Sequence, residues 1–165
     1  MSIVTFSKKS HLPFSAERVY DWHMREDVFR RLIPPWEHVA VLQRDRPIQN
    51  GAVAELLIGR WSLSFRWKLI HDEVIPERQF VDYQVKGPFK SWRHTHRFIP
   101  DGDTGSYLED VIQYEVPFGD LGRRLTHWLI ERKLVRLFDY RHSVTLHTML
   151  AEATRAGTTP ATLTE

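Results

Sequence analysis

The sequence predicts an α+β protein in which an antiparallel sheet packs against one long C-terminal helix. Two short helical patterns follow a first strand, strand patterns then occupy residues 37–116, and residues 119–153 form one helical pattern without proline. Strands that are grouped together, rather than alternating with helices, are typical of α+β folds. A long amphipathic helix must bury its apolar stripe, and the inner face of the sheet is the only large partner available.

The N-terminal part contains the first strand and both short helices. Alternating residues predict a strand over residues 2–12. Ser15 is a suitable N-cap for a helix that continues to residue 24, because its hydroxyl can accept from a backbone amide of the first turn. Apolar residues at helical spacing predict a second helix over residues 27–33, which Pro34-Pro35 ends.

The middle of the chain predicts six strands separated by turn signals. They cover residues 37–42, 52–58, 61–69, 79–86, 92–98 and 106–116. Asn50-Gly51 and Gly87-Pro88 are the clearest turn signals. The strand over residues 61–69 has the most regular alternation, with Trp61, Leu63, Phe65, Trp67 and Leu69 on one face.

The C-terminal helix is predicted to start at Gly119 and to be about 45–50 Å long, at about 1.5 Å per residue. That length is sufficient to cross a whole sheet. Its apolar stripe consists of Leu121, Leu125, Trp128, Val135, Phe138, His142, Leu146 and Met149. We expect one domain over residues 1–153 and a flexible tail over residues 154–165.

Composition excludes several classes of protein. A net charge of +2 is too small an excess to imply a nucleic-acid partner. The chain has no cysteine, which fits a reducing cytoplasm, and no apolar stretch approaches a membrane span. Six Trp and nine Phe suit a fold that lines a pocket with rings. We therefore expect a cytoplasmic protein without a membrane span, and the oligomeric state stays open.

The strand over residues 92–98 carries the most informative pattern. Trp92, His94, His96 and Phe98 alternate onto one face, where an ordinary core strand would place aliphatic residues. Buried imidazoles are costly unless they are paired. The same alternation in the neighbouring strands gives two inward sets that contain carboxylates: Phe80, Asp82 and Gln84, and Leu108, Asp110, Ile112 and Tyr114. With His142 on the helical stripe, these polar groups are expected to converge inside the fold.

The order of elements and several motifs resemble the START-like superfamily, also called SRPBCC or Bet v 1-like, and within it the polyketide cyclase/dehydrase-like branch. The motifs that carry the resemblance are residues 15–20, 80–84, 87–89, 92–98, 110–114, 117–119 and 140–142. The resemblance implies a helix-grip fold: a curved antiparallel sheet of about six to seven strands wrapped around the long helix, with a deep apolar cavity between them. It implies no particular activity, since the superfamily includes carriers, receptors and enzymes.

Three interpretations of the polar cluster remain open. His-x-His could supply two metal ligands, with Asp110 or His142 as a third, but no His/Glu helix motif accompanies it, and we predict no metal and no cofactor. His94 or His96 with Asp110 could act as an acid–base pair, as a metal-free cyclase, aromatase or dehydratase requires. The cluster could instead anchor the polar end of a bound molecule without catalysis.

The leading hypothesis is that the protein binds a small hydrophobic or amphipathic molecule, similar to a lipid or a polyketide, in an internal cavity. The alternative is a polyketide cyclase, aromatase or dehydratase whose catalytic residues are His94, His96 and Asp110. The predicted ligand-binding residues are Trp61, Phe65, Trp67, Phe80, Asp82, Gln84, Trp92, Phe98, Ile112, Tyr114, Phe138 and His142.

Overall fold

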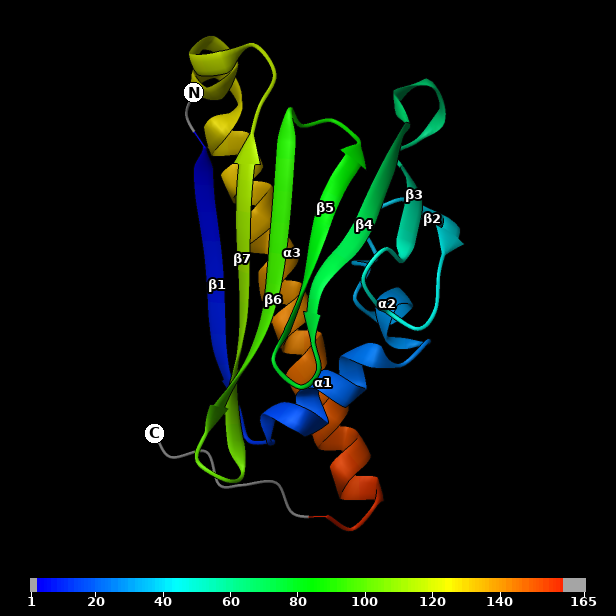
Figure 1. Ribbon diagram of the computed structural model, residues 1–165, viewed down its shortest axis with the longest axis vertical. Helices are drawn as coiled ribbons and strands as arrows, with labels where there is room; N and C mark the ends of the chain where they lie inside the picture. Colours follow the sequence, from blue (N-terminus) through cyan, green and yellow to red (C-terminus); the bar gives the residue numbers. More distant parts are fainter. Residues whose placement is uncertain (1–2, 159–165) are drawn as a thin grey trace.

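Seven strands form a single antiparallel sheet in the computed structural model, which describes residues 3–158. The strands are β1 (Val4–Leu12), β2 (Val39–Arg44), β3 (Val53–Ile58), β4 (Phe65–Ile75), β5 (Gln79–Lys86), β6 (Ser91–Asp101) and β7 (Gly105–Glu115). Their order in the sheet is β1-β7-β6-β5-β4-β3-β2 (Figure 1). Only the first strand leaves the sequential order, because β1 pairs with the last strand, β7.

Three α-helices accompany the sheet: α1 (Ala16–Met24), α2 (Val28–Arg31) and α3 (Gly119–Arg155). The Ser15 hydroxyl accepts from the Arg18 amide at 3.3 Å and thereby caps α1. The long α3 runs along one face of the sheet, and α1 lies across one end of it (Figure 1). The predicted fold class, an α+β helix-grip arrangement, is confirmed.

The structure corrects the strand predicted over residues 61–69. Trp61–Leu63 form a short 3-10 helix, and β4 begins only at Phe65. Trp61 and Leu63 are consequently 88% and 85% exposed rather than inward-facing. Period-2 alternation at these residues therefore does not reflect a strand, because the chain reverses direction between β3 and β4 there.

The predicted stripe of α3 is only partly buried. Phe138, His142 and Met149 are buried, whereas Leu121, Leu125, Trp128 and Val135 are exposed. The reason is length: 37 helical residues span about 55 Å, whereas an 11-residue strand such as β7 spans about 36 Å. The first turns of α3 therefore extend past the end of the sheet (Figure 1).

The domain limits and the C-terminal tail that the sequence predicts are only partly within the described chain. Helix α3 continues two residues beyond the predicted end, to Arg155. Of the tail predicted over residues 154–165, residues 159–165 lie outside the described residues. Within residues 3–158, no helix combines the length and the apolar content that crossing a membrane would need.

The buried core has two apolar parts. One part packs α1 against the ends of β6 and β7 and includes Val19, Trp22, Phe98 and Leu108. The other packs the middle of α3 on the sheet and includes Trp92, Ile112, Tyr114, Leu134 and Phe138. The histidines and carboxylates of the central strands are buried alongside these two parts.

Candidate functional site

Six elements contribute to one buried network of imidazoles and carboxylates on the inner face of the sheet. Strand register brings the central groups together: His96 pairs directly with Asp110 on β7, and His94 pairs directly with Asp82 on β5. The members of this His–Asp network are Ser10 on β1, His71 on β4, Asp82 on β5, His94 and His96 on β6, Asp110 on β7 and His142 on α3.

Asp110 is the centre of the network because three imidazoles contact its carboxylate. Its Oδ1 lies 2.8 Å from His94 Nε2 and 2.8 Å from His96 Nδ1. Its Oδ2 lies 2.7 Å from His142 Nε2, and the other nitrogen of that ring lies 2.8 Å from the Ser10 hydroxyl. Since a carboxylate can only accept, each of these three ring nitrogens carries the proton.

Asp82 forms the second carboxylate site, on the opposite side of the two β6 histidines. Its Oδ2 accepts from His96 Nε2 at 3.2 Å and lies 3.8 Å from His94 Nδ1. Its Oδ1 lies 2.5 Å from His71 Nδ1, although these two groups are not oriented as a hydrogen bond. The side chains of Asp82 and His96 are both 13% exposed, so they form the outermost part of the network.

The two carboxylates shift the protonation equilibria of the neighbouring imidazoles. Burial alone would lower the pKa of His96, but Asp110 and Asp82 outweigh it and raise the pKa to about 9. Burial and the adjacent His96 charge lower the pKa of His94 to about 4, despite its bond to Asp110. At neutral pH, His96 is therefore a cation that donates from both nitrogens, and His94 is neutral.

Both carboxylates remain ionised inside the protein. Burial raises the pKa of Asp110, but the His96 charge and three imidazole hydrogen bonds outweigh burial and hold it well below its ordinary value. Burial also raises the pKa of Asp82, but His71 and His96 outweigh burial and lower it. The network consequently holds two buried negative charges, and the cation on His96 lies between them.

The structure brings together five of the seven polar residues that alternation placed inside the fold: Asp82, His94, His96, Asp110 and His142. The other two lie elsewhere. Gln84 holds the turn after β5 through both Phe89 backbone groups, at 2.6 and 3.3 Å. Tyr114 is buried among rings, 5.4 Å from Phe89 and 6.2 Å from Trp92 between centroids.

The predicted aromatic residues divide into three groups. Trp67 and Trp92 pack edge to face at 4.9 Å, and both contact Phe89, which the sequence did not single out. Phe80 stacks on His96 at 4.2 Å, and with Phe98 it belongs to the apolar part beneath α1. The remaining predicted residues are buried Ile112 and Phe138, which join the Trp92 cluster, and exposed Trp61 and Phe65.

Sequence reasoning missed three residues of this region. His71 continues the alternation of Trp67 and Leu69 on β4, and a longer predicted strand would have included it. Ser10 lies on β1, whose alternation is weak, so no sequence signal distinguished it. His23 is on α1 and packs beside the network.

His23 gives the protein a pH-dependent stability. Its Nδ1–H donates to the Val19 carbonyl at 2.8 Å, and its ring packs against Phe98 at 5.1 Å. Burial lowers its pKa from 6.5 to about 4; Val19 and Asp110 oppose this shift, whereas His96 and His142 add to it. Between pH 6.5 and 4 the unfolded chain binds a proton that the folded chain does not, so stability falls as the pH falls.

We expect His23→Gln to remove part of that pH dependence. The free energy of unfolding of the wild type should decrease by about 3 kcal/mol more than that of the variant between pH 7 and pH 4. Urea denaturation at several pH values measures the difference. His147→Gln, at an exposed histidine on α3, should retain the wild-type slope. Equal slopes for His23→Gln and the wild type would contradict the assignment.

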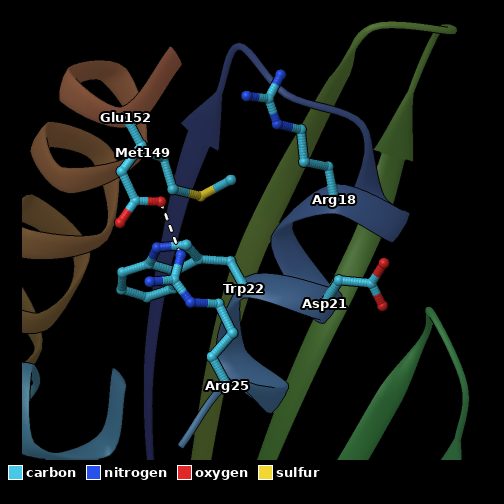
Figure 2. Close-up of a pocket in the computed structure, with 6 residues that line it drawn as sticks. All are labelled: Arg18, Asp21, Trp22, Arg25, Met149 and Glu152. Carbon is cyan, nitrogen blue, oxygen red and sulfur yellow. Dashed lines mark hydrogen bonds and ion pairs between the residues drawn. The ribbon is translucent and has the colours of Figure 1, made fainter. Parts of the chain in front are cut away.

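Two surface pockets accompany the site, and none of the predicted ligand-binding residues lines either of them. The first, about 280 Å³, lies between α1 and the end of α3, where Arg25 and Glu152 pair at 2.7 Å (Figure 2). The second, about 610 Å³, lies between Trp36 and the middle of α3. The deep cavity between sheet and helix therefore stays a prediction.

Comparison with known proteins assigns the chain to a family. A family model described as polyketide cyclase/dehydrase and lipid transport matches residues 12–142. Comparison with curated proteins gives no match.

Solved structures share the fold at low sequence identity. TTHA0849 from Thermus thermophilus is 19% identical, with a TM-score of 0.65, and the match covers 88% of this chain and 99% of that one. Norcoclaurine synthase from Thalictrum flavum, in complex with dopamine and hydroxybenzaldehyde, is 11% identical, with a TM-score of 0.69 and coverages of 91% and 88%. Ara h 8.0201 is 12% identical, with a TM-score of 0.58 and coverages of 88% and 99%. The architecture is thus Bet v 1-like, and the chain belongs to the polyketide cyclase/dehydrase and lipid transport family.

Proposed function

We propose that the protein binds a small amphipathic molecule between α3 and the inner face of β3, β4 and β5. The observation that carries this proposal is that aromatic rings and ionisable side chains occur together on the inner face of the sheet. Rings of Trp67, Phe89 and Trp92 pack together, and Trp92 lies 6.4 Å from the His94 ring of the His–Asp network. Asp82 and His96 of the same network are each 13% exposed. A ligand site of this kind is mostly apolar, with a few polar groups that fix the ligand's orientation.

The packing of α3 supports this location. The backbone of α3 comes closest to β1 and β7, and it stands further from the inner face of β3, β4 and β5. Inward side chains on that face, Trp67 and Leu69, are only partly buried. An apolar body placed there would remove their remaining surface from water, which favours binding by roughly 25 cal/mol per Å².

The family and its neighbours agree with a small organic ligand. The family description includes lipid transport. The similar structure from Thalictrum flavum holds dopamine and hydroxybenzaldehyde, two small aromatic molecules with polar groups. We infer the same ligand class here, with the polar end directed toward Asp82 and His96.

Binding can be tested with defined probes and one blocking variant. A medium-chain fatty acid, a flavonoid and 4-hydroxybenzaldehyde are titrated into the protein by calorimetry, and freshly purified protein is examined by native mass spectrometry. We expect at least one probe or copurified molecule to bind at one per chain. Leu69→Trp, which adds volume on the inner face, should keep the fold and lose binding. Arg66→Trp, on the outer face of β4 where the side chain is 61% exposed, should leave binding unchanged.

Three outcomes decide between the functions. Loss of folding in Leu69→Trp would mean that side chains already fill this space. Equal binding by Arg66→Trp and Leu69→Trp would place the ligand elsewhere. Chemical conversion of a bound probe, lost in His96→Gln, would favour the cyclase or dehydratase function. His96 and His94 share Asp110, and this arrangement is the specific observation that supports such an enzyme.

A further inference from the structure

We propose that Asp82, His94 and His96 form a binding site for a divalent transition-metal ion. One ligand atom from each of the three residues lies within 4.8 Å of the other two. Two imidazole nitrogens and one carboxylate oxygen are a donor set that suits Zn²⁺, Fe²⁺ and related ions. Binding would displace the proton that His96 Nε2 shares with Asp82, because a ligating imidazole nitrogen must be deprotonated. From the sequence alone we predict no metal, because a His-x-His spacing often occurs in proteins that bind no metal there.

Two of the three distances between ligand atoms are close to the edges of a metal-centred tetrahedron. Bonds of about 2.0–2.1 Å place neighbouring ligand atoms about 3.3 Å apart. Asp82 Oδ2 lies 3.2 Å from His96 Nε2 and 3.8 Å from His94 Nδ1. The remaining distance, between the two ring nitrogens, is within 4.8 Å, so the three atoms would have to move closer together to bond one ion.

The second observation concerns the ring nitrogens of His94 and His96 that would not bind the ion. The nitrogens of His94 and His96 that point away from Asp82 both contact Asp110 Oδ1 at 2.8 Å. Metal-bound histidines typically donate their other ring N–H to a carboxylate, which fixes the ring and increases its basicity. Here one buried carboxylate orients both rings, and His71 Nδ1 lies 2.5 Å from the other oxygen of Asp82 without the orientation of a hydrogen bond.

The third observation is that His94 Nδ1 has no hydrogen-bond donor among the described residues. His94 donates through Nε2 to Asp110, so in the neutral ring Nδ1 is an acceptor. That acceptor faces Asp82 Oδ2, a second acceptor, at 3.8 Å. A cation between these two atoms removes the repulsion, whereas no side chain among residues 3–158 donates a hydrogen bond to His94 Nδ1. Three protein ligands also leave a fourth position for water or for an oxygen of a bound molecule.

The test uses untagged protein, since a histidine tag would itself bind the ion. Chelator-treated protein is titrated with ZnCl₂ by calorimetry and with CoCl₂ by visible absorption. We expect one ion per chain and cobalt bands typical of nitrogen and oxygen ligands. Asp82→Asn and His96→Gln should each weaken affinity by at least about 100-fold, because altering outer partners alone costs about 10–100-fold.

The matched control is a surface pair of the same chemistry. His127 and Glu131 lie 3.5 Å apart on the exposed side of α3, and His127→Gln should leave zinc affinity unchanged. Loss of binding in His127→Gln, unchanged affinity in both site variants, or no ion bound by the wild type would each overturn the proposal. Should the site variants fail to fold, X-ray absorption of the zinc-loaded wild type decides: two imidazoles support the site, and fewer contradict it. None of these measurements requires an organic ligand, so the outcome is independent of the proposed binding function.

Discussion

Asp110→Ala is expected to lower the free energy of unfolding by about 3–5 kcal/mol. Asp110 is buried, and ring nitrogens of His94, His96 and His142 lie 2.7–2.8 Å from its carboxylate oxygens. Without it, three imidazoles lose an acceptor in a region that water barely reaches. The cation on His96 would keep only Asp82 as a partner, and a buried charge that loses its partner is strongly destabilising.

Guanidinium chloride denaturation followed by circular dichroism measures this loss. Glu109→Ala is the matched control, because Glu109 is the neighbouring residue on the outer face of β7. It pairs with Arg97 at 3.2 Å near the surface, and such pairs contribute about 0–1 kcal/mol. A loss below about 1 kcal/mol for Asp110→Ala would mean that the network contributes little to stability.

Much of the network was predictable from period-2 alternation. Strand register is determined by which residues face the core, so the pattern of β6 and β7 was enough to put His94, His96 and Asp110 on the same face. His142 followed from helical spacing in the same way. Local periodicity specifies the face of an element, and this was sufficient for groups on adjacent strands.

The remaining features depend on where elements end and how they cross. Trp61 belongs to a turn although its neighbours alternate like a strand, because chain reversal after β3 takes precedence over the local pattern. Leu121 and Leu125 lie on the apolar stripe of α3 but beyond the end of the sheet. Ser10 contacts His142 across 132 positions of sequence, and no local pattern encodes such a pairing.

The metal proposal changes how the network is interpreted. Without an ion, the network is a polar part of the core that orients strands and helix. With an ion on Asp82, His94 and His96, Asp110 becomes a positioning residue that fixes both histidine rings. Both descriptions give Asp110 the same large effect on stability, so stability alone does not distinguish them and metal titration does.

Phe138→Ala is the second substitution with a large expected effect, again about 3–5 kcal/mol. Phe138 is 1% exposed and lies on the buried side of α3. Its ring packs edge to face on His94 at 5.2 Å and against Phe6 at 5.6 Å. Truncation removes a large apolar surface and leaves a cavity beside the network, which the surrounding strands can close only partly.

Chemical denaturation again measures the loss, with Val135→Ala as the control on the same helix. Val135 is 44% exposed, so its truncation should cost less than about 1 kcal/mol. Because Phe138 and Asp110 both contact His94, the double variant should depart from additivity by about 0.5–3 kcal/mol. Strict additivity would show that the apolar packing of α3 and the His–Asp network stabilise the fold independently. A loss for Phe138→Ala as small as that for Val135→Ala would mean that α3 does not depend on this contact to hold the sheet.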